Sequence, residues 1–284
     1  MSGGTLLRTT KSQPRFPLSF SDGKPIDISD KRCHAGLFIV NADDWGQDLA
    51  TTERTYECIL RGGISSVSAM VFMQDSERAA AVARERGIDT GLHLNFTTPF
   101  SAIRSPTRLK AHQQRICQYL RRHRLAQVLC HPGLANYFGY VVAAQLEEFG
   151  RLYGVEPRRI DGHHHMHLCA NVLLGGLLPR GTIVRRNLSF QPGEKGIANR
   201  LCRRLIDGFL ARRYFLTDFF FSLMPLNPSS RLRRIISLAR RHIVEVEAHP
   251  INLAEYSFLA GGEIIREAGD IPIASSFGCH RLAI

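Results

Sequence analysis

The chain has 284 residues, of which 44% are apolar, and it carries a formal net charge of +12. This length suits one large α/β domain, and no stretch approaches the ~20 apolar residues that a membrane span needs. The basic charge comes without a helix-turn-helix, an RNA-binding signature or zinc-finger spacing, so we expect no nucleic-acid partner.

From residue 37 onward, apolar runs that suit buried strands alternate with helical patterns. The predicted strands are 37–40, 65–73, 88–95, 160–167, 182–185, 217–222, 243–249 and a closing segment at 271–276. The predicted helices include 49–61 and 76–87, capped by Asp48 and Asp75, and further helices at 111–124, 139–153 and 171–178. Seven or eight such units predict an α/β protein, a divergent (β/α) TIM-like barrel of mostly parallel strands.

Residues 1–34 are rich in Ser, Thr, Pro and Gly and contain no apolar core of a secretory signal. This composition predicts a flexible leader before a single domain at 35–284. The seven cysteines are odd in number and form no C-x-x-C pair, which is typical of reduced thiols in the cytoplasm. The sequence does not determine the oligomeric state, and a homodimer is one of the alternatives.

The excess of basic residues lies in three clusters, at 111–124, 200–213 and 231–242. The arginines alternate there with Leu, Ile or Tyr at helical spacing, so solvated outer helix faces are the simplest interpretation. The functional alternative is a substrate that is anionic or linked to a lipid.

One segment near the middle of the chain places four imidazoles beside a carboxylate, in the run Asp161-Gly162-His163-His164-His165-Met166-His167. The apolar Ile160 before it predicts the mouth of a buried strand. Alternation along that strand would turn His164 away from the face shared by Asp161, His163, His165 and His167. A surface histidine tract is the alternative, but the apolar strand favours a metal site.

Other polar residues fall where predicted strands end, and the carboxyl ends of barrel strands meet at one mouth. Asp43 and Asp44 follow the first strand, His93 ends the third and His249 ends a later one. Taken singly, each has a structural explanation, such as a turn and helix-cap pair at 43–44 or a hydrogen-bonded strand-end histidine. Their joint occurrence favours metal-assisted hydrolysis, in which an Asp-His-His set leaves coordination positions open.

Four motifs then occur in order: Asn41-Ala42-Asp43-Asp44-Trp45-Gly46, Gly91-Leu92-His93-Leu94-Asn95-Phe96-Thr97, the histidine run, and Glu245 to Pro250. Together they resemble the YdjC-like carbohydrate deacetylase family, which includes chitooligosaccharide deacetylases and a hopanoid-biosynthesis-associated branch. The resemblance spans residues 36–276. It implies a divergent (β/α) barrel that uses one divalent metal to remove the acetyl group from an N-acetylated sugar, within an oligosaccharide or a glycolipid.

The resemblance also implies roles for individual residues. Asp44 resembles the metal-binding carboxylate, and His93 and His163 resemble its two imidazole partners. Asp43 looks like the general base. His249 falls at the family's His-Pro motif, which implies a catalytic or substrate-contacting role, and imidazole suits an acid that protonates the departing amine.

Other side chains are expected around this centre. His165 and His167 are candidates for supporting the ligands or contacting substrate, whereas His164 is expected to pack against the barrel helices. Sugar hydroxyls are expected to meet Arg185 or Arg186 and Asp218. Where the family has Phe, Trp45 is interpreted as core filling rather than as a platform for a sugar ring.

The sequence leaves alternatives for the identity of the metal ion and for the biochemical function. The resemblance implies Mg²⁺, but two imidazoles and a carboxylate favour Zn²⁺, Co²⁺, Ni²⁺ or Mn²⁺. A phosphoesterase or amidohydrolase on a similar barrel would hold two metals about 3.5–4 Å apart. A non-catalytic carbohydrate-binding relative would keep the ligands and lose the groups that transfer protons.

Overall fold

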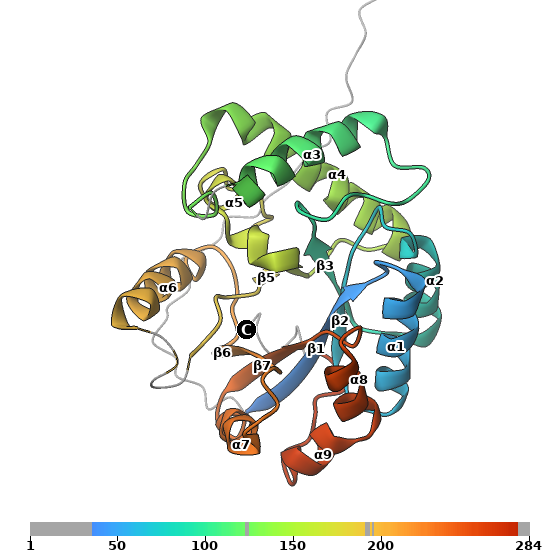
Figure 1. Ribbon diagram of the computed structural model, residues 1–284, viewed down its shortest axis with the longest axis vertical. Coiled ribbons are helices and arrows are strands. Elements are labelled where there is room, and N and C mark those ends of the chain that lie inside the picture. Colours follow the sequence, from blue (N-terminus) through green and yellow to red (C-terminus); the bar gives the residue numbers. More distant parts are fainter. Residues whose placement is uncertain (1–35, 123–124, 191–193, 195, 278–284) are drawn as a thin grey trace, which may run out of the picture. The chain divides into compact units, whose positions relative to one another are not determined.

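A computed structural model describes residues 36–122, 125–190, 194 and 196–277 (Figure 1). The predicted leader and its boundary with the domain lie outside these residues, as do Cys33 and Cys279. The five described cysteines are free thiols.

Seven parallel strands form one sheet that curls into a half-barrel, in the order β5-β4-β3-β2-β1-β7-β6. The strands are β1 (Leu37–Trp45), β2 (Ser66–Ala69), β3 (Thr90–Leu94), β4 (Arg159–Gly162), β5 (Ile183–Val184), β6 (Phe219–Ser222) and β7 (Ile243–Ala248). The α/β barrel prediction is therefore confirmed, with seven strands. The predicted closing strand at 271–276 is wrong, because this segment makes a single bridge, from Ile273 to Phe38.

Helices surround the outer side of the sheet (Figure 1). They are α1 (Leu49–Leu60), α2 (Ser76–Arg86), α3 (Thr107–Arg122), α4 (Ala135–Tyr153), α5 (Ala170–Leu174), α6 (Ile197–Leu210), α7 (Ser229–Leu238), α8 (Leu253–Ala260) and α9 (Glu263–Ala268). Asp48 caps α1 as predicted, since its side chain accepts a hydrogen bond from the Thr51 amide. The Asp75 carboxylate instead pairs with Arg78 and makes no cap hydrogen bond.

The two faces of β1 bury different chemistry. Phe38, Val40 and Ala42 join the main apolar core between sheet and helices. On the inner face, Ile39 joins a small apolar cluster, whereas Asn41 is buried and hydrogen-bonded. Because side chains alternate along a strand, the barrel interior changes from apolar to polar toward the carboxyl ends of its strands.

Trp45, at the end of β1, is fully buried, and its indole nitrogen donates a hydrogen bond to the Ala79 carbonyl at 3.2 Å. It therefore fills the core and offers no face to a sugar ring, as the sequence predicted.

The histidine run was predicted as a strand, but most of it does not form one. β4 ends at Gly162, and a short 3₁₀ segment, His163–Leu168, follows. His164 and His165 both have left-handed backbones, with φ of 54° and 57°. The segment folds back so closely that a Cβ on Gly162 would lie 3.0 Å from His167. The strict alternation of a strand is therefore lost after Gly162.

Candidate metal centre

Asp44 turns toward the mouth of the barrel because the backbone of β1 is irregular there. The register of β1 against β2 shifts between Ala42 and Trp45, and Asp44 has a left-handed backbone with φ of 65°. In a regular strand, Asp43 and Asp44 would face opposite sides of the sheet. The irregularity instead leaves both carboxylates buried among the polar groups at the strand ends, in a backbone conformation that non-glycine residues rarely adopt.

His93 lies between two carboxylates. It pairs in register with Asp161 across β3 and β4, and its Nδ1 lies 2.8 Å from an Asp161 oxygen. Its Nε2 is 3.2 Å from Asp44 and is buried without a hydrogen-bond partner. With Nδ1–H donated to Asp161, Nε2 is left as the nitrogen that can bind a metal beside Asp44, which is the arrangement of a metal-ligating histidine.

His163 completes the group, with its Nδ1 2.8 Å from the same Asp44 oxygen. The potential ligand atoms of Asp44, His93 and His163 all lie within 4.8 Å of one another. Burial alone would raise the pKa of Asp44, but the two imidazoles hold it well below its usual value. One charged carboxylate and two imidazoles suit a divalent metal, and the orphaned Nε2 of His93 gains a partner when one binds.

A second possible ligand group consists of Asp43, His93 and Asp161. Arg185 forms ion pairs of 2.7 Å with both of its carboxylates. Those two carboxylates already have a cationic partner, so Asp44 is the carboxylate better suited to a metal.

Arg185 is buried at the centre of the barrel, with its side chain 1% exposed. Besides Asp43 and Asp161, its guanidinium donates to Glu245 at 2.8 Å and lies over the ring of Phe220. It therefore cannot meet sugar hydroxyls as expected from the sequence, because its donors are directed at buried carboxylates.

Glu245 and Glu247 bring two more carboxyl groups into this interior from β7, and both are buried. Burial raises the pKa of Glu247 well above its usual value, and the nearby Asp43 carboxylate raises it further. One oxygen of Glu247 is buried without a hydrogen-bond partner. Acids at alternate positions of an apolar strand are the sequence signal of such a charged interior.

His249 follows β7 and stands beside Asp43, with 3.9 Å between its Nε2 and an Asp43 oxygen. Its backbone amide donates to the Glu255 carboxylate at 2.7 Å, which anchors the His-Pro segment. The imidazole is 35% exposed, so it reaches the solvent-filled mouth. The two residues predicted to move protons are thus neighbours.

Of the other three histidines, His164 lies differently from its prediction. His164 was expected to point away, but its ring centroid lies 4.0 Å from that of His163, with the two ring planes tilted by 35°, and its Nδ1 is 2.9 Å from the Thr97 hydroxyl. His165 lies 3.7 Å from Glu247 and is part-exposed, and burial lowers its pKa to about 3. His167 is fully buried and bonds the Arg185 carbonyl at 2.9 Å, so it braces the structure without reaching substrate.

The structure does not bring Asp218 to the centre. Asp218 precedes β6, and its carboxylate accepts a hydrogen bond from the amide of Ile243, the first residue of β7. It therefore lies at the amino ends of these strands, whereas the metal ligands lie at the carboxyl ends. Arg186 pairs with Asp207 of α6.

A cavity of about 260 Å³ lies next to the segment that follows His163, and none of the three candidate ligands lines it. His164 and His165 line one part of it, and Leu188, Asn199 and Arg203 line another. Among the described residues, no helix is long and apolar enough to cross a membrane.

The model of the YdjC-like protein family matches residues 37–250. This chain belongs to that family. Its similarity to curated members covers a smaller region: a chitooligosaccharide deacetylase of Proteus mirabilis (strain HI4320) is 31% identical over 137 residues, 47% of this chain and 51% of the relative. A carbohydrate deacetylase of Mus musculus is also 31% identical over 137 residues, 47% of this chain and 44% of the relative.

The matched region spans about half the length of these curated relatives. Among solved structures, a protein of Enterococcus faecalis V583, described as a proposed cellobiose-phosphate cleavage protein, matches with a TM-score of 0.59. The match covers 85% of this chain and 97% of that chain at 17% identity, so it supports the fold alone.

We predict that replacing Asp44, His93 or His163 singly with Ala abolishes binding of a divalent metal and leaves the fold intact, because an open three-ligand site needs every donor. Titration calorimetry with Zn²⁺ and Mn²⁺, beside circular dichroism, measures both properties. His165→Ala is the matched control and retains the metal. Loss of metal in His165→Ala, with retention in His163→Ala, would move the ligand assignment by two residues.

We predict that Glu247→Gln becomes more stable relative to the wild type as the pH rises above the ordinary pKa of a glutamate. The folded state holds a proton on Glu247 that the unfolded state releases, so this group's contribution to stability is complete below its unfolded pKa and is lost with rising pH. Urea unfolding of both proteins in chelator, from about pH 4 to about pH 8, measures the difference. A difference that is independent of pH contradicts the raised pKa.

Proposed function

We propose that this protein is a metal-dependent hydrolase that removes the N-acetyl group from an acetylamino sugar and releases acetate. The observation that carries the proposal is the juxtaposition of a candidate ligand set, Asp44, His93 and His163, with a carboxylate and an imidazole, Asp43 and His249. Curated relatives named as deacetylases of chitooligosaccharides and carbohydrates support the same reaction.

In this proposal one divalent ion is held by Asp44, His93 and His163. When bound, it supplies Lewis-acid polarisation of the amide carbonyl and a more acidic water. The resemblance to the family implies Mg²⁺, whereas the two nitrogen ligands favour Zn²⁺, Co²⁺ or Mn²⁺.

Asp43 acts as the general base. Burial alone would raise its pKa, but Arg185 and His93 together outweigh burial and hold the pKa below its usual value, so Asp43 is a carboxylate at neutral pH. Arg185 and Asn41 together hold both of its oxygens, which fixes the group in one orientation. Asp43 takes a proton from the water that attacks the acetyl carbonyl carbon.

His249 acts as the general acid. An amide expels its amine only when the nitrogen is protonated, and His249 supplies that proton as the C–N bond breaks. Its exposure at the mouth, beside Asp43, suits a group that meets the sugar nitrogen and exchanges protons with solvent. The products are acetate and the free amino sugar.

The alternative of a two-metal phosphoesterase has less support. A second metal at the other ligand group would share His93 and would displace Arg185 from Asp43 and Asp161. A non-catalytic sugar-binding relative has no need of Asp43 and His249 side by side. The cytoplasmic location and the single domain at 35–284 remain predictions from the sequence.

We expect the purified protein to release acetate from N-acetylglucosamine oligomers, to stop in chelator and to recover when a divalent metal is added. An enzyme-coupled acetate assay over soluble and lipid-linked N-acetyl sugars measures this and finds the preferred substrate. Phosphate release from sugar phosphates, with two metals bound per chain and no acetate, would favour the phosphoesterase instead.

We predict that Asp43→Asn keeps its metal and lowers kcat by about 10²–10⁴-fold, the usual contribution of a positioned base. His249→Ala should have a similar effect on amides and a smaller effect on an activated acetate ester, whose leaving group needs no proton. Asp218→Asn, at the opposite ends of the strands, is the control and turns over normally. Near-normal turnover in Asp43→Asn would rule out Asp43 as the base.

A further inference from the structure

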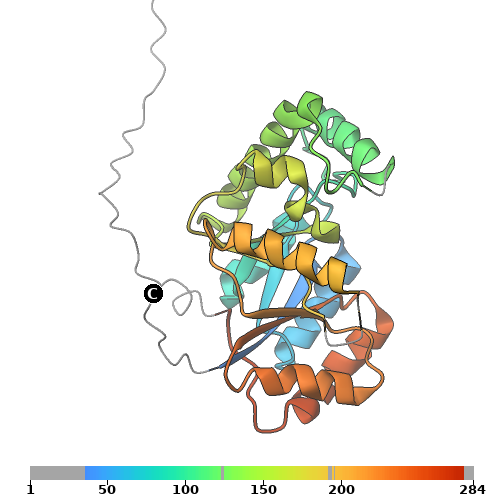
Figure 2. The same ribbon diagram turned by 90° about the vertical axis from the view of Figure 1, so that its left-hand side faces the viewer.

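The helix α6 carries an apolar stripe that the described part of the protein leaves uncovered. Ile197, Leu201 and Leu205 recur every fourth residue and are 83%, 56% and 69% exposed. Leu210 is buried on the opposite side of the same helix. Figure 1 shows α6 at one side of the sheet, apart from the other helices, and Figure 2 shows it from that side. Helices of soluble domains normally turn such a stripe inward.

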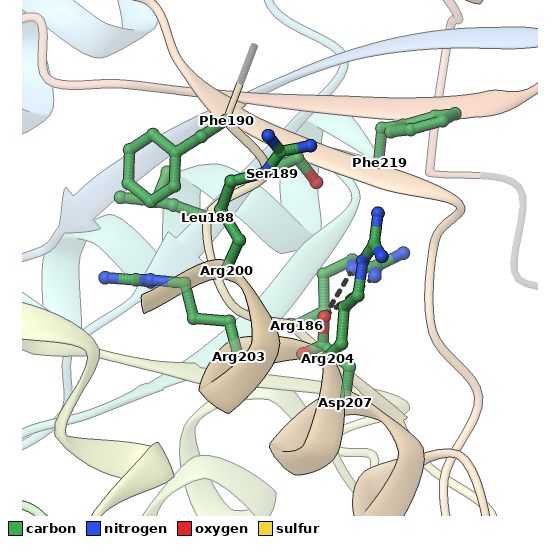
Figure 3. A pocket seen from close by; sticks show the side chains of 9 residues that line it. All are labelled: Arg186, Leu188, Ser189, Phe190, Arg200, Arg203, Arg204, Asp207 and Phe219. Carbon is green, nitrogen blue, oxygen red and sulfur yellow. Dashed lines mark hydrogen bonds and ion pairs between the residues drawn. The ribbon is translucent and has the colours of Figure 1, made fainter. Parts of the chain in front are cut away.

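Arginines gather along the same helix. A cavity of about 130 Å³ between α6 and the segment after β5 is lined by Arg186, Arg200, Arg203 and Arg204, with Asp207 as its single carboxylate (Figure 3). Arg186 pairs with Asp207 at 2.7 Å. Among the described residues, Arg200 and Arg204 have no ion pair.

The pocket therefore concentrates positive charge without enough counter-charge from the described protein. Like charges brought together repel, and the cost is recovered when an anion sits among them. Guanidinium groups bind phosphate oxygens through paired hydrogen bonds. The pocket has the chemistry of a phosphate site, and Arg200 and Arg204 lie next to the apolar stripe in the sequence of α6.

We propose that α6 docks this protein on the surface of an anionic phospholipid bilayer. Leu201 and Leu205 enter the boundary between headgroups and acyl chains, and Arg200 and Arg204 contact lipid phosphates. An exposed apolar face flanked by arginines is the pattern of a helix that lies in a membrane interface. The charge complements the negative surface that anionic lipids create.

The position of α6 gives this docking a consequence for the candidate metal centre. Leu188 and Arg203 line both the arginine pocket and the cavity that contains His164 and His165. A bilayer under α6 would therefore hold that cavity next to lipid headgroups. Docking itself needs no catalytic activity, so it is tested separately from the proposed function.

The test is sedimentation of the full chain with vesicles of phosphatidylglycerol and phosphatidylcholine in equal parts, against pure phosphatidylcholine. We expect binding to the anionic vesicles alone. Arg200→Gln with Arg204→Gln should weaken it by about 30-fold, from roughly 1 kcal/mol for each arginine at the surface. Leu201→Ser with Leu205→Ser should weaken it by about tenfold or more.

Matched control variants distinguish a specific effect of the α6 surface from the effects of net charge and of exposed apolar side chains in general. Arg121→Gln with Arg122→Gln removes the same charge from α3, and Leu60→Ser removes an equally exposed leucine, 68%, from α1. Both controls should bind like the wild type. Equal losses in the two arginine pairs would mean that only net charge matters and would overturn the proposal.

Two other partners of the α6 surface would give different results in these binding experiments. If the pocket serves a free anion, inorganic phosphate binds by calorimetry while anionic vesicles do not, which overturns the docking. If a second copy covers the stripe, sedimentation velocity shows a dimer that Leu201→Ser with Leu205→Ser dissociates, and vesicles bind neither form. A monomeric protein that binds the anionic vesicles supports the proposal.

Discussion

The interior of this barrel depends on the guanidinium of Arg185. It meets carboxylates from three strands, Asp43 of β1, Asp161 of β4 and Glu245 of β7, while Arg185 itself follows β5. Buried carboxylates without a cation repel one another and lose their hydration, which costs several kcal/mol for each ion. A single buried arginine therefore links strands from both halves of the sheet.

This one side chain also organises the candidate metal centre. Its grip on Asp43 fixes the proposed base, and its contact with Asp161 supports the carboxylate that orients His93. Its backbone carbonyl accepts a hydrogen bond from the His167 Nε2, and this contact anchors the segment that carries His163. The proposed ligands and the proposed base are thus held by one connected network, in which rigid neighbours keep each group in its orientation.

The ligands reach their places through irregular backbone. Asp44 and two residues of the histidine segment have positive φ, which regular strands do not provide. Each conformation is sparsely populated in isolation, and surrounding contacts such as Thr97 to His164 hold it. The cavity that His164 and His165 line is bounded on another side by α6, whose exposed apolar stripe and arginines differ in chemistry from the charged interior.

The sequence by itself determined the alternation of strands and helices, the parallel α/β class and the ligand candidates, because periodicity and motif order are local properties. It misplaced His164, since the pattern of a strand was extended past Gly162, where the backbone folds back. It also assigned Arg185 and Asp218 to sugar contacts. Only the tertiary structure decided that Arg185 is enclosed by acids and that Asp218 lies at the opposite strand ends, because burial and partners depend on which distant segments meet.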